Sequence, residues 1–268
     1  MPIFDHDDIS INYQIVGTGQ RVLFFNGSGA TLESAHLFIK ALAKECQVLA
    51  HDQRGLGKTS IPDGPYTMAQ YASDGAALLD HVGWETCVVV GMSFGGMVAQ
   101  EFAVTYPHRV ERLMVLCTSA GGDAGASYPL HELGSLTPEE RSAKVLTLTD
   151  SRYTPEWLAE HPVDAEMARM RSEQAAIPKS KDVVRGERLQ LVARISHDVA
   201  DRLHNVSAPT FVAAGAFDGI APVSNSEEIV KRIPDATMAV YQGGHIFTAQ
   251  DPQAIRDIRT FITTGVRP

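Results

Sequence analysis

A serine between two glycines stands directly after an apolar run in the first half of the chain. Residues 91–95 read Gly-Met-Ser-Phe-Gly, and they follow Cys-Val-Val-Val at 87–90 and precede a helix-like stretch. A serine at a sharp strand-to-helix turn carries its hydroxyl out above a sheet, and the flanking glycines let the tight backbone pass. A hydroxyl in that position becomes a nucleophile once a base takes its proton. Ser93 is therefore the candidate nucleophile, in preference to a structural turn serine.

A candidate base and a candidate acid follow later apolar runs. Serine chemistry needs a histidine to take the proton and a carboxylate to fix the tautomer of that histidine. In an open parallel sheet, functional groups gather beyond the carboxyl ends of the strands. Asp218 follows one apolar run, and His245 follows the next on a glycine pair. The order Ser93, Asp218, His245 predicts a catalytic triad, with Asp123 as the competing acid.

The elements that must position these residues are short apolar runs alternating with longer helical patterns. This alternation is typical of the α/β class, with a mostly parallel, doubly wound sheet covered by helices on both faces. The expected strands are residues 9–16, 21–26, 47–51, 87–91, 112–117, 209–214 and 237–241. Three of them lead directly into the candidate nucleophile, acid and base.

The alternation stops after the expected strand 112–117, and the pattern is helical only until about residue 204. Two helix starts are marked by Thr-Pro-Glu, at Thr137 and Thr154, where threonine is an N-cap and proline the first helical residue. A single helix is expected over residues 182–203. We therefore predict an α/β core formed by residues 1–121 and 205–268, with an all-helical cap inserted at residues 122–204.

Several arginines of the inserted segment are interleaved with glutamates. Such a pattern is typical of a solvated face whose charges pair with one another, and we prefer this interpretation for most of them over a grip on an anionic substrate. The arginines are Arg169, Arg171, Arg185, Arg188 and Arg194.

Composition limits the classes of partner. The 268 residues carry a net charge of −9, with 44% hydrophobic and 21% charged residues, which is ordinary for a globular protein and argues against a nucleic-acid binder. No apolar stretch approaches the roughly 18 residues that span a bilayer, and the acidic N-terminus lacks a signal-peptide region. We expect a cytoplasmic protein that binds a small-molecule substrate, without nucleic-acid or membrane partners, as a monomer or homodimer.

Cysteine and glycine patterns indicate neither a metal nor a cofactor. Cys46, Cys87 and Cys117 are odd in number and without C-x-x-C spacing, so buried thiols are expected rather than disulfides or a zinc site. Gly-Lys-Thr at 57–59 imitates part of a phosphate-binding loop, but the required upstream glycine is replaced by Asp52. No cofactor and no metal are predicted.

Together these residues resemble the α/β-hydrolase fold family, as a serine hydrolase with a helical cap, over nearly the whole chain. The resemblance implies that Ser93 is the nucleophile, His245 the general base and acid, and Asp218 the orienting carboxylate. It also implies an oxyanion hole made by the backbone N–H groups of Ser28 and Phe94. The segments that carry the resemblance are residues 26–29, 52–57, 91–95, 215–222 and 243–245.

The loop at residues 26–29 departs from the family pattern. The family usually has His-Gly where this chain has Asn26 followed by Gly27. Asparagine can also hydrogen-bond to hold the loop, so the oxyanion hole is expected to survive. Asn26 and Trp157, which lies in the predicted cap, are the candidate substrate-binding residues.

The function that the resemblance implies is cleavage of a carboxylic ester or lactone of a small molecule through an acyl-enzyme on Ser93. The serine turn at residues 91–95, called the elbow below, continues as Gly-Met-Val-Ala-Gln at 96–100. Residues 91–100 and 218–222 look most like those of bacterial enol-lactone hydrolases and related esterases. Three alternatives stay open: a carbon–carbon bond hydrolase, a cofactor-free perhydrolase, or a non-catalytic small-molecule receptor on the same scaffold. Dehalogenases and epoxide hydrolases are disfavoured, because they need a carboxylate where this chain has Ser93.

Overall fold

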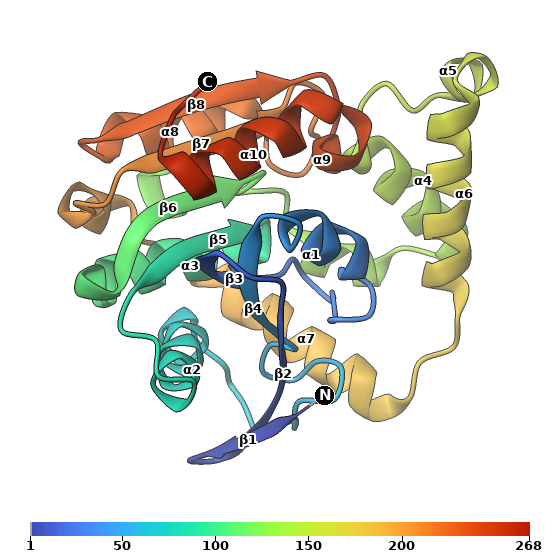
Figure 1. The fold of residues 1–268 in the computed structure, drawn as a ribbon. Helices are drawn as coiled ribbons and strands as arrows, with labels where there is room; N and C mark the ends of the chain where they lie inside the picture. The colour runs from blue at the N-terminus through green and yellow to red at the C-terminus, as the bar shows by residue number, and fades with distance from the viewer. Residues whose placement is uncertain (1) are drawn as a thin grey trace.

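The computed structural model describes residues 2–268 and is built around one eight-stranded sheet (Figure 1). Its strands are β1 (Ile3–His6), β2 (Ile9–Val16), β3 (Gln20–Phe25), β4 (Cys46–His51), β5 (Cys87–Met92), β6 (Val110–Leu116), β7 (Thr210–Gly215) and β8 (Ala236–Tyr241). They lie in the order β1-β2-β4-β3-β5-β6-β7-β8. β2 is antiparallel to its neighbours β1 and β4, and the pairs from β4 to β8 are parallel. The predicted α/β class is confirmed.

Helices cover both faces of the sheet. One face packs against α1 (His36–Leu42) and α10 (Pro252–Thr264), which lie in front of the strands in Figure 1. The other packs against α2 (Met68–His81), α3 (Phe94–Thr105) and α8 (Val223–Arg232). Short elements join them: η1 (Pro107–Arg109) before β6 and α9 (Phe247–Gln250) after β8.

The central strand β5 shows why its sequence is apolar throughout. Val88 and Val90 join the cluster that holds α1 and α10, whereas Cys87 and Val89 join the cluster on the opposite face. Successive side chains of a strand point to opposite faces, and here both faces are buried, so no position is left for a polar residue. β1, by contrast, is an edge strand with exposed and half-buried positions, and the sequence pattern did not predict it.

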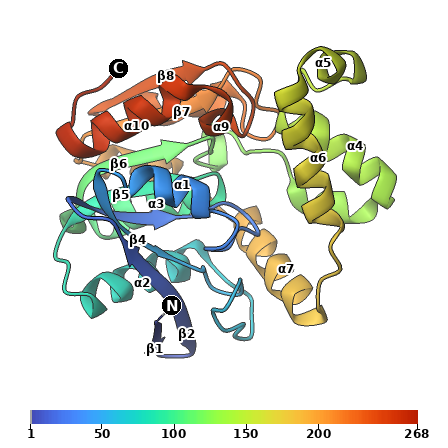
Figure 2. The same cartoon turned by 45° about the vertical axis from the view of Figure 1, so that its right-hand side comes forward.

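The chain between β6 and β7 holds helices alone, from Leu116 to Thr210. They are η2 (Gly122–Ala124), η3 (Leu130–Ser135), α4 (Pro138–Thr149), α5 (Pro155–Glu160), α6 (Pro162–Ala176), α7 (Lys181–Ile195) and η4 (Ala200–Asn205). Figure 2 shows α4, α5 and α6 grouped beside the sheet, with α7 running back towards it. Among the described helices, none combines the length and the apolar composition needed to cross a bilayer.

In the inserted segment, local sequence signals predict the starts of α4 and α5 correctly but misplace the end of α7. Thr137 forms a capping box with Glu140, and the Thr154 side chain accepts from the backbone of Trp157, as expected for N-caps. The predicted helix 182–203 is wrong at its end, because α7 stops at Ile195. Asp198 there pairs with Gly121 in a β-bridge, and its carboxylate accepts the N–H of Ala200. These bonds outcompete continuation of the helix.

The end of the inserted segment also belongs to the hydrophobic core. Ala193, Val199 and Leu203 are buried in the cluster that contains α2 and α3. The separation of residues 122–204 as a cap domain therefore stays a prediction. All three cysteines are buried, as expected for small apolar side chains.

Burial of His51 at the end of β4 gives the first testable consequence. The ring lies edge-on to Phe25, and burial lowers the pKa of His51 to about 4, although the charge of Asp52 opposes the shift. Because the ordinary pKa is about 6.5, the unfolded chain takes up a proton that the folded protein does not. Stability is therefore expected to fall as the pH drops from about 6.5 towards 4, by about 2 kcal/mol at pH 5 from this residue.

Urea unfolding at pH 7 and pH 5 measures this effect. His51→Gln should remove about 2 kcal/mol of the pH-dependent loss. The control is His108→Gln, which alters an exposed histidine and should leave the loss unchanged. Equal pH-dependent losses in the wild type and in His51→Gln would show that this histidine is not the cause.

Candidate active site

The predicted nucleophile lies at a strained turn between β5 and α3. Ser93 has φ 54° and ψ −116°, a backbone conformation that costs a non-glycine residue roughly 1–3 kcal/mol. The flanking glycines leave no room for a side chain, since a Cβ on Gly91 would lie 2.1 Å from the Gly95 carbonyl oxygen. A Cβ on Gly95 would lie 2.0 Å from the carbonyl oxygen of Phe25. The Thr118 hydroxyl donates to the Ser93 carbonyl oxygen at 2.8 Å and helps to hold the turn.

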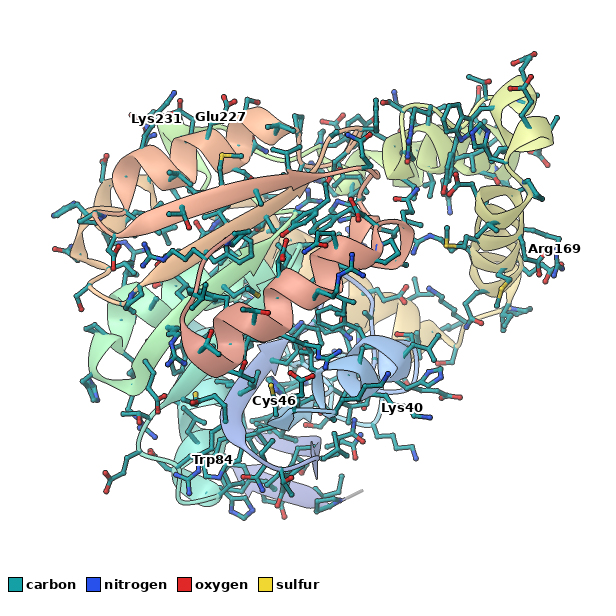
Figure 3. The ribbon with its side chains drawn as sticks, turned by 45° about the horizontal axis from the view of Figure 1, so that its top comes forward. Lys40, Cys46, Trp84, Arg169, Glu227 and Lys231 are labelled. Carbon is teal, nitrogen blue, oxygen red and sulfur yellow. The ribbon has the colours of Figure 1, made fainter. Side chains whose placement is uncertain are left out.

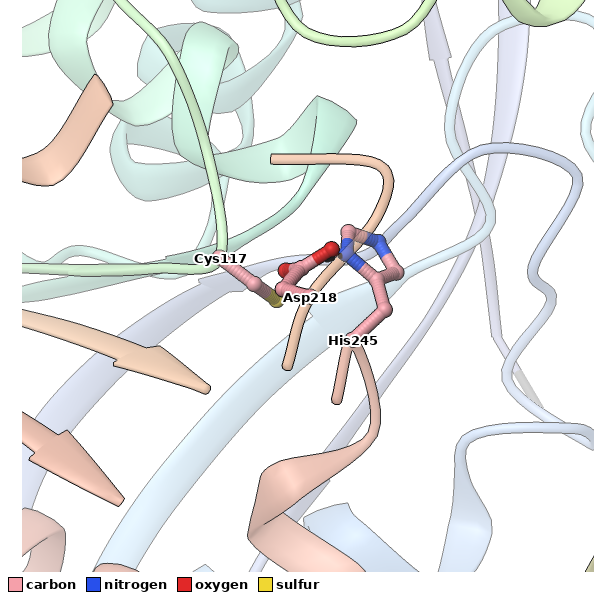
Figure 4. Close-up of side chains that lie close together, drawn as sticks. All are labelled: Cys117, Asp218 and His245. Atoms are coloured by element: carbon pink, nitrogen blue, oxygen red, sulfur yellow. Dashed lines mark hydrogen bonds and ion pairs between the residues drawn. The ribbon is translucent and has the colours of Figure 1, made fainter. Parts of the chain in front are cut away.

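The serine, histidine and aspartate singled out in the sequence meet at this turn. His245 Nε2 is 2.9 Å from Ser93 Oγ, and His245 Nδ1 is 2.8 Å from Asp218 Oδ2. Figure 4 shows the carboxylate and the imidazole facing one another. An ionised carboxylate only accepts hydrogen bonds, so Nδ1 carries the proton and Nε2 is free to accept the serine hydroxyl. The arrangement has the geometry that activates a serine.

The carboxylate is fixed by the backbone that follows it. Asp218 Oδ1 accepts the N–H groups of Ile220 and Ala221 at 2.8 and 2.9 Å, and the side chain is fully buried. The competing acid, Asp123, is exposed instead and pairs with Arg232 at 3.1 Å. The structure thus brings Asp218 to His245.

The loop at residues 26–29, which is predicted to form part of the oxyanion hole and is called the oxyanion loop below, lies next to Ser93. A Cβ placed on Gly27 would be 3.7 Å from Ser93 Cβ, so the loop passes directly beside the nucleophile. Phe94 is the first residue of α3, and its N–H therefore has no carbonyl partner within the helix. The Ser28 hydroxyl is buried without a hydrogen-bond partner among the described residues.

The asparagine that replaces the family's histidine holds this loop in shape. Asn26 Oδ1 accepts the N–H of Gly27 at 2.9 Å, and its Nδ2 donates to the Thr31 carbonyl at 3.2 Å. The side chain is buried at 5% exposure. These bonds keep the loop ordered, and contact of Asn26 with a substrate stays a prediction.

Helices of the inserted segment touch the site on two sides, which the sequence did not reveal. Gln190 of α7 accepts the N–H of Gly29, in the oxyanion loop, at 2.7 Å. On the other side, the N–H of His245 donates to the carbonyl of Thr149, the last residue of α4, at 2.6 Å. These bonds tie the candidate oxyanion loop and the candidate base to the inserted helices.

Trp157 is not brought to the serine. It belongs to α5, where its ring stacks on His161 with centroids 3.6 Å apart. Its indole N–H donates to Asp164 at 3.4 Å, and the Arg152 guanidinium lies 4.8 Å from its ring centre. Within the described chain these polar and ring contacts all stay inside the inserted segment. Its role in substrate binding stays a prediction.

A buried thiol lies beside the acid and the base (Figure 4). The ligating atoms of Cys117, Asp218 and His245 lie within 4.8 Å of one another, a spacing that could hold a metal ion. Both nitrogens of His245 are already engaged, however, and metal ligation by sulfur requires a thiolate. Burial and the charge of Asp218 raise the pKa of Cys117 well above its ordinary value. The donor set therefore fits a hydrogen-bonded triad better than a metal site.

Comparisons with known proteins agree with this geometry. The alpha/beta hydrolase fold family matches residues 20–252. The chain is 30% identical to a poly(3-hydroxyalkanoate) depolymerase of Ectopseudomonas oleovorans, over 88% of this chain and 82% of that protein. It is 27% identical to 3-oxoadipate enol-lactonase 2 of Acinetobacter baylyi, over 95% of each chain.

A solved structure extends the match to the fold. The enol-lactonase from Burkholderia xenovorans LB400 superimposes with a TM-score of 0.80 at 22% identity, over 98% of this chain and 100% of that one. At that identity the likeness supports the fold alone. With the family match over most of its length and a relative at 30% identity, the chain belongs to the family of hydrolases with the α/β-hydrolase fold.

Proposed function

We propose that this protein is a serine hydrolase that cleaves a carboxylic ester or lactone of a small molecule through an acyl-enzyme on Ser93. The observation that carries the proposal is the continuous chain of hydrogen bonds from Ser93 through His245 to Asp218, at 2.9 and 2.8 Å. The similarity to an enol-lactonase supports a lactone or ester as the bond that is cleaved.

In the acylation half of the reaction, Ser93 Oγ attacks the carbonyl carbon while His245 Nε2 takes its proton. Asp218 accepts the Nδ1–H bond and stabilises the imidazolium that forms. The backbone N–H groups of Phe94 and Ser28 would hold the negative oxygen of the tetrahedral intermediate. His245 then gives its proton to the leaving alkoxide, and the acyl group stays on the serine.

Deacylation reverses these roles with water as the nucleophile. His245 takes a proton from the water, whose oxygen attacks the acyl carbon, and returns it to Ser93 Oγ when the acid leaves. In a lactone the alkoxide and the acid belong to one molecule, so the product is a single hydroxy acid, or a keto acid where an enol lactone releases its enol. No step requires a cofactor.

Covalent trapping tests the proposal. A fluorophosphonate probe should add once to the protein, and peptide mass spectrometry should place the adduct on Ser93, with no adduct in Ser93→Ala. A hydrolysis panel of aryl esters, lactones and vinylogous diketones then identifies the bond that is cleaved. Turnover of the diketones alone would favour a carbon–carbon bond hydrolase. Failure of both labelling and turnover on the whole panel would favour a receptor.

A further inference from the structure

A cavity of about 170 Å³ lies between the start of α3, the loop after β6 and the end of α7. Its lining includes Met97, Ser119, Ser127, Arg194 and His197. Met97 is four residues after Ser93, a distance of about 6 Å along a helix axis. A water molecule occupies roughly 30 Å³ in the liquid, so the cavity has room for a small polar group on a short chain.

Arg194 is the one permanently charged side chain among the residues that line this cavity. Its Nη2 donates to Ser127 Oγ at 2.6 Å and to the Tyr128 carbonyl at 2.7 Å. Its Nη1 is buried without a hydrogen-bond partner, and no carboxylate of residues 2–268 lies within ion-pair distance. Burial lowers the pKa of Arg194 to about 10, which leaves the guanidinium charged at neutral pH.

One arginine of the inserted segment, Arg169, pairs with glutamates as the sequence pattern suggested. Arg169 projects from the outer side of α6 (Figure 3) and pairs with Glu166 and Glu173 on its own helix. Arg194 differs because its charge is turned inward and uncompensated. Its place in the last turn of α7 is favourable for a cation, but that interaction does not satisfy Nη1.

Two histidines line the cavity: His131 is exposed, and His197 is buried. The buried histidine adds no second charge. Burial lowers the pKa of His197 to about 4, so the ring is neutral at pH 7. Its Nε2 lies 3.2 Å from the Ser119 carbonyl, which can only accept, so Nε2 carries the proton. Its Nδ1 is then an acceptor, buried and without a partner among the described residues. The cavity lining therefore contains a guanidinium N–H and a neutral acceptor, both without a partner among the described residues.

We propose that this cavity binds a carboxylate of the substrate through Arg194 Nη1, so that the substrate is an ester or lactone that carries a free carboxylate. A carboxylate supplies the negative charge and the acceptor that the buried guanidinium lacks, and such charge-assisted hydrogen bonds are the strong ones. Met97, which lines the same cavity, follows Ser93 by about one helical turn. The assignment to substrate rests on the proposed function, whereas binding of the anion itself does not.

Paired substrates test the specificity. The probes are the monoethyl esters of succinic, glutaric and adipic acid, each compared with the ethyl ester of the corresponding half-amide, which is similar in shape but neutral. For at least one chain length, the wild type should favour the carboxylate in kcat/KM by at least about tenfold. Arg194→Gln should bring that ratio close to one, mainly through KM.

The control is Arg188→Gln, on the exposed side of the same helix, which removes the same charge and should keep the wild-type ratio. An equal fall in both variants would assign the preference to the general charge of α7 and overturn the site. If Arg194→Gln does not fold, as thermal unfolding would show, the wild-type ratio decides by itself. A ratio near one at every chain length overturns the proposal.

Direct binding separates this proposal from the proposed function. Glutarate should bind to the Ser93→Ala protein in a calorimetric titration, and adding Arg194→Gln should weaken that binding at least about tenfold. Hydrolysis by Ser93→Ala at the wild-type rate would refute the serine mechanism. The glutarate titration would still test the anion site by itself. Serine-dependent hydrolysis without a carboxylate preference or glutarate binding would refute the anion site alone.

Discussion

Ser93→Ala is expected to lower the turnover of an ester or lactone substrate by at least about a thousandfold, because removing a triad member leaves only background catalysis. In the proposed mechanism the hydroxyl oxygen forms the acyl-enzyme, and we expect no neighbouring group to replace it. The Cys117 thiol lies beside Asp218 and His245, but burial and the charge of Asp218 hold its pKa high, so it stays protonated. The loss should appear in kcat, measured with the best substrate of the panel.

Thermal unfolding distinguishes a loss of catalysis from a loss of the folded structure. The substitution removes one oxygen at a position where the backbone strain and the glycine contacts remain, so thermal unfolding should show a folded protein. A folded Ser93→Ala protein with near wild-type turnover would rule out the serine as the nucleophile. A folded but inactive variant that no longer reacts with fluorophosphonate is the expected outcome.

Asp218→Asn is expected to lower turnover by roughly a hundredfold to ten-thousandfold, through the tautomer of His245. The backbone N–H groups of Ile220 and Ala221 both point at Oδ1, so the amide oxygen of asparagine must take that place. The amide NH₂ then faces His245 Nδ1, which must become an acceptor. The histidine proton moves to Nε2, where it blocks transfer from Ser93.

Asp123→Asn is the matched control for this experiment. It makes the same chemical change in the acid that follows β6, but that acid is exposed and pairs with Arg232. Turnover by Asp123→Asn should stay within about twofold of the wild type, as expected for a weak surface ion pair. Equal losses in the two variants, or a loss in Asp123→Asn alone, would show that the orienting acid has been misassigned.

Much of the core could be predicted because its signals are local. Alternating apolar runs and helices identify a parallel sheet, since a strand buried on both faces, such as β5, has no polar position. The elbow is only partly local, because Gly91 is demanded by contacts within the turn, whereas Gly95 makes room for the end of β3. The order of Ser93, Asp218 and His245 could be read because each follows a strand of that sheet.

Predictions failed or stayed open where distant parts of the chain compete. The predicted end of α7 was wrong because Asp198 pairs with Gly121, some 80 residues earlier. The periodicity of the helix itself gives no sign of that pairing. β1 was missed because an edge strand with one half-buried face has a weak pattern.

The sequence by itself determined the fold class and the candidate nucleophile and base, Ser93 and His245, because strand periodicity and turn chemistry act over a few residues. Only the tertiary structure decided which acid reaches His245, how Gln190 joins the oxyanion loop, and that Arg194 faces inward without a partner. These outcomes depend on which side chains are buried together and on whether each buried charge finds an opposite one. Arginines that look alike in sequence thus differ in the folded protein, where Arg169 pairs with glutamates in solvent and Arg194 lines a cavity.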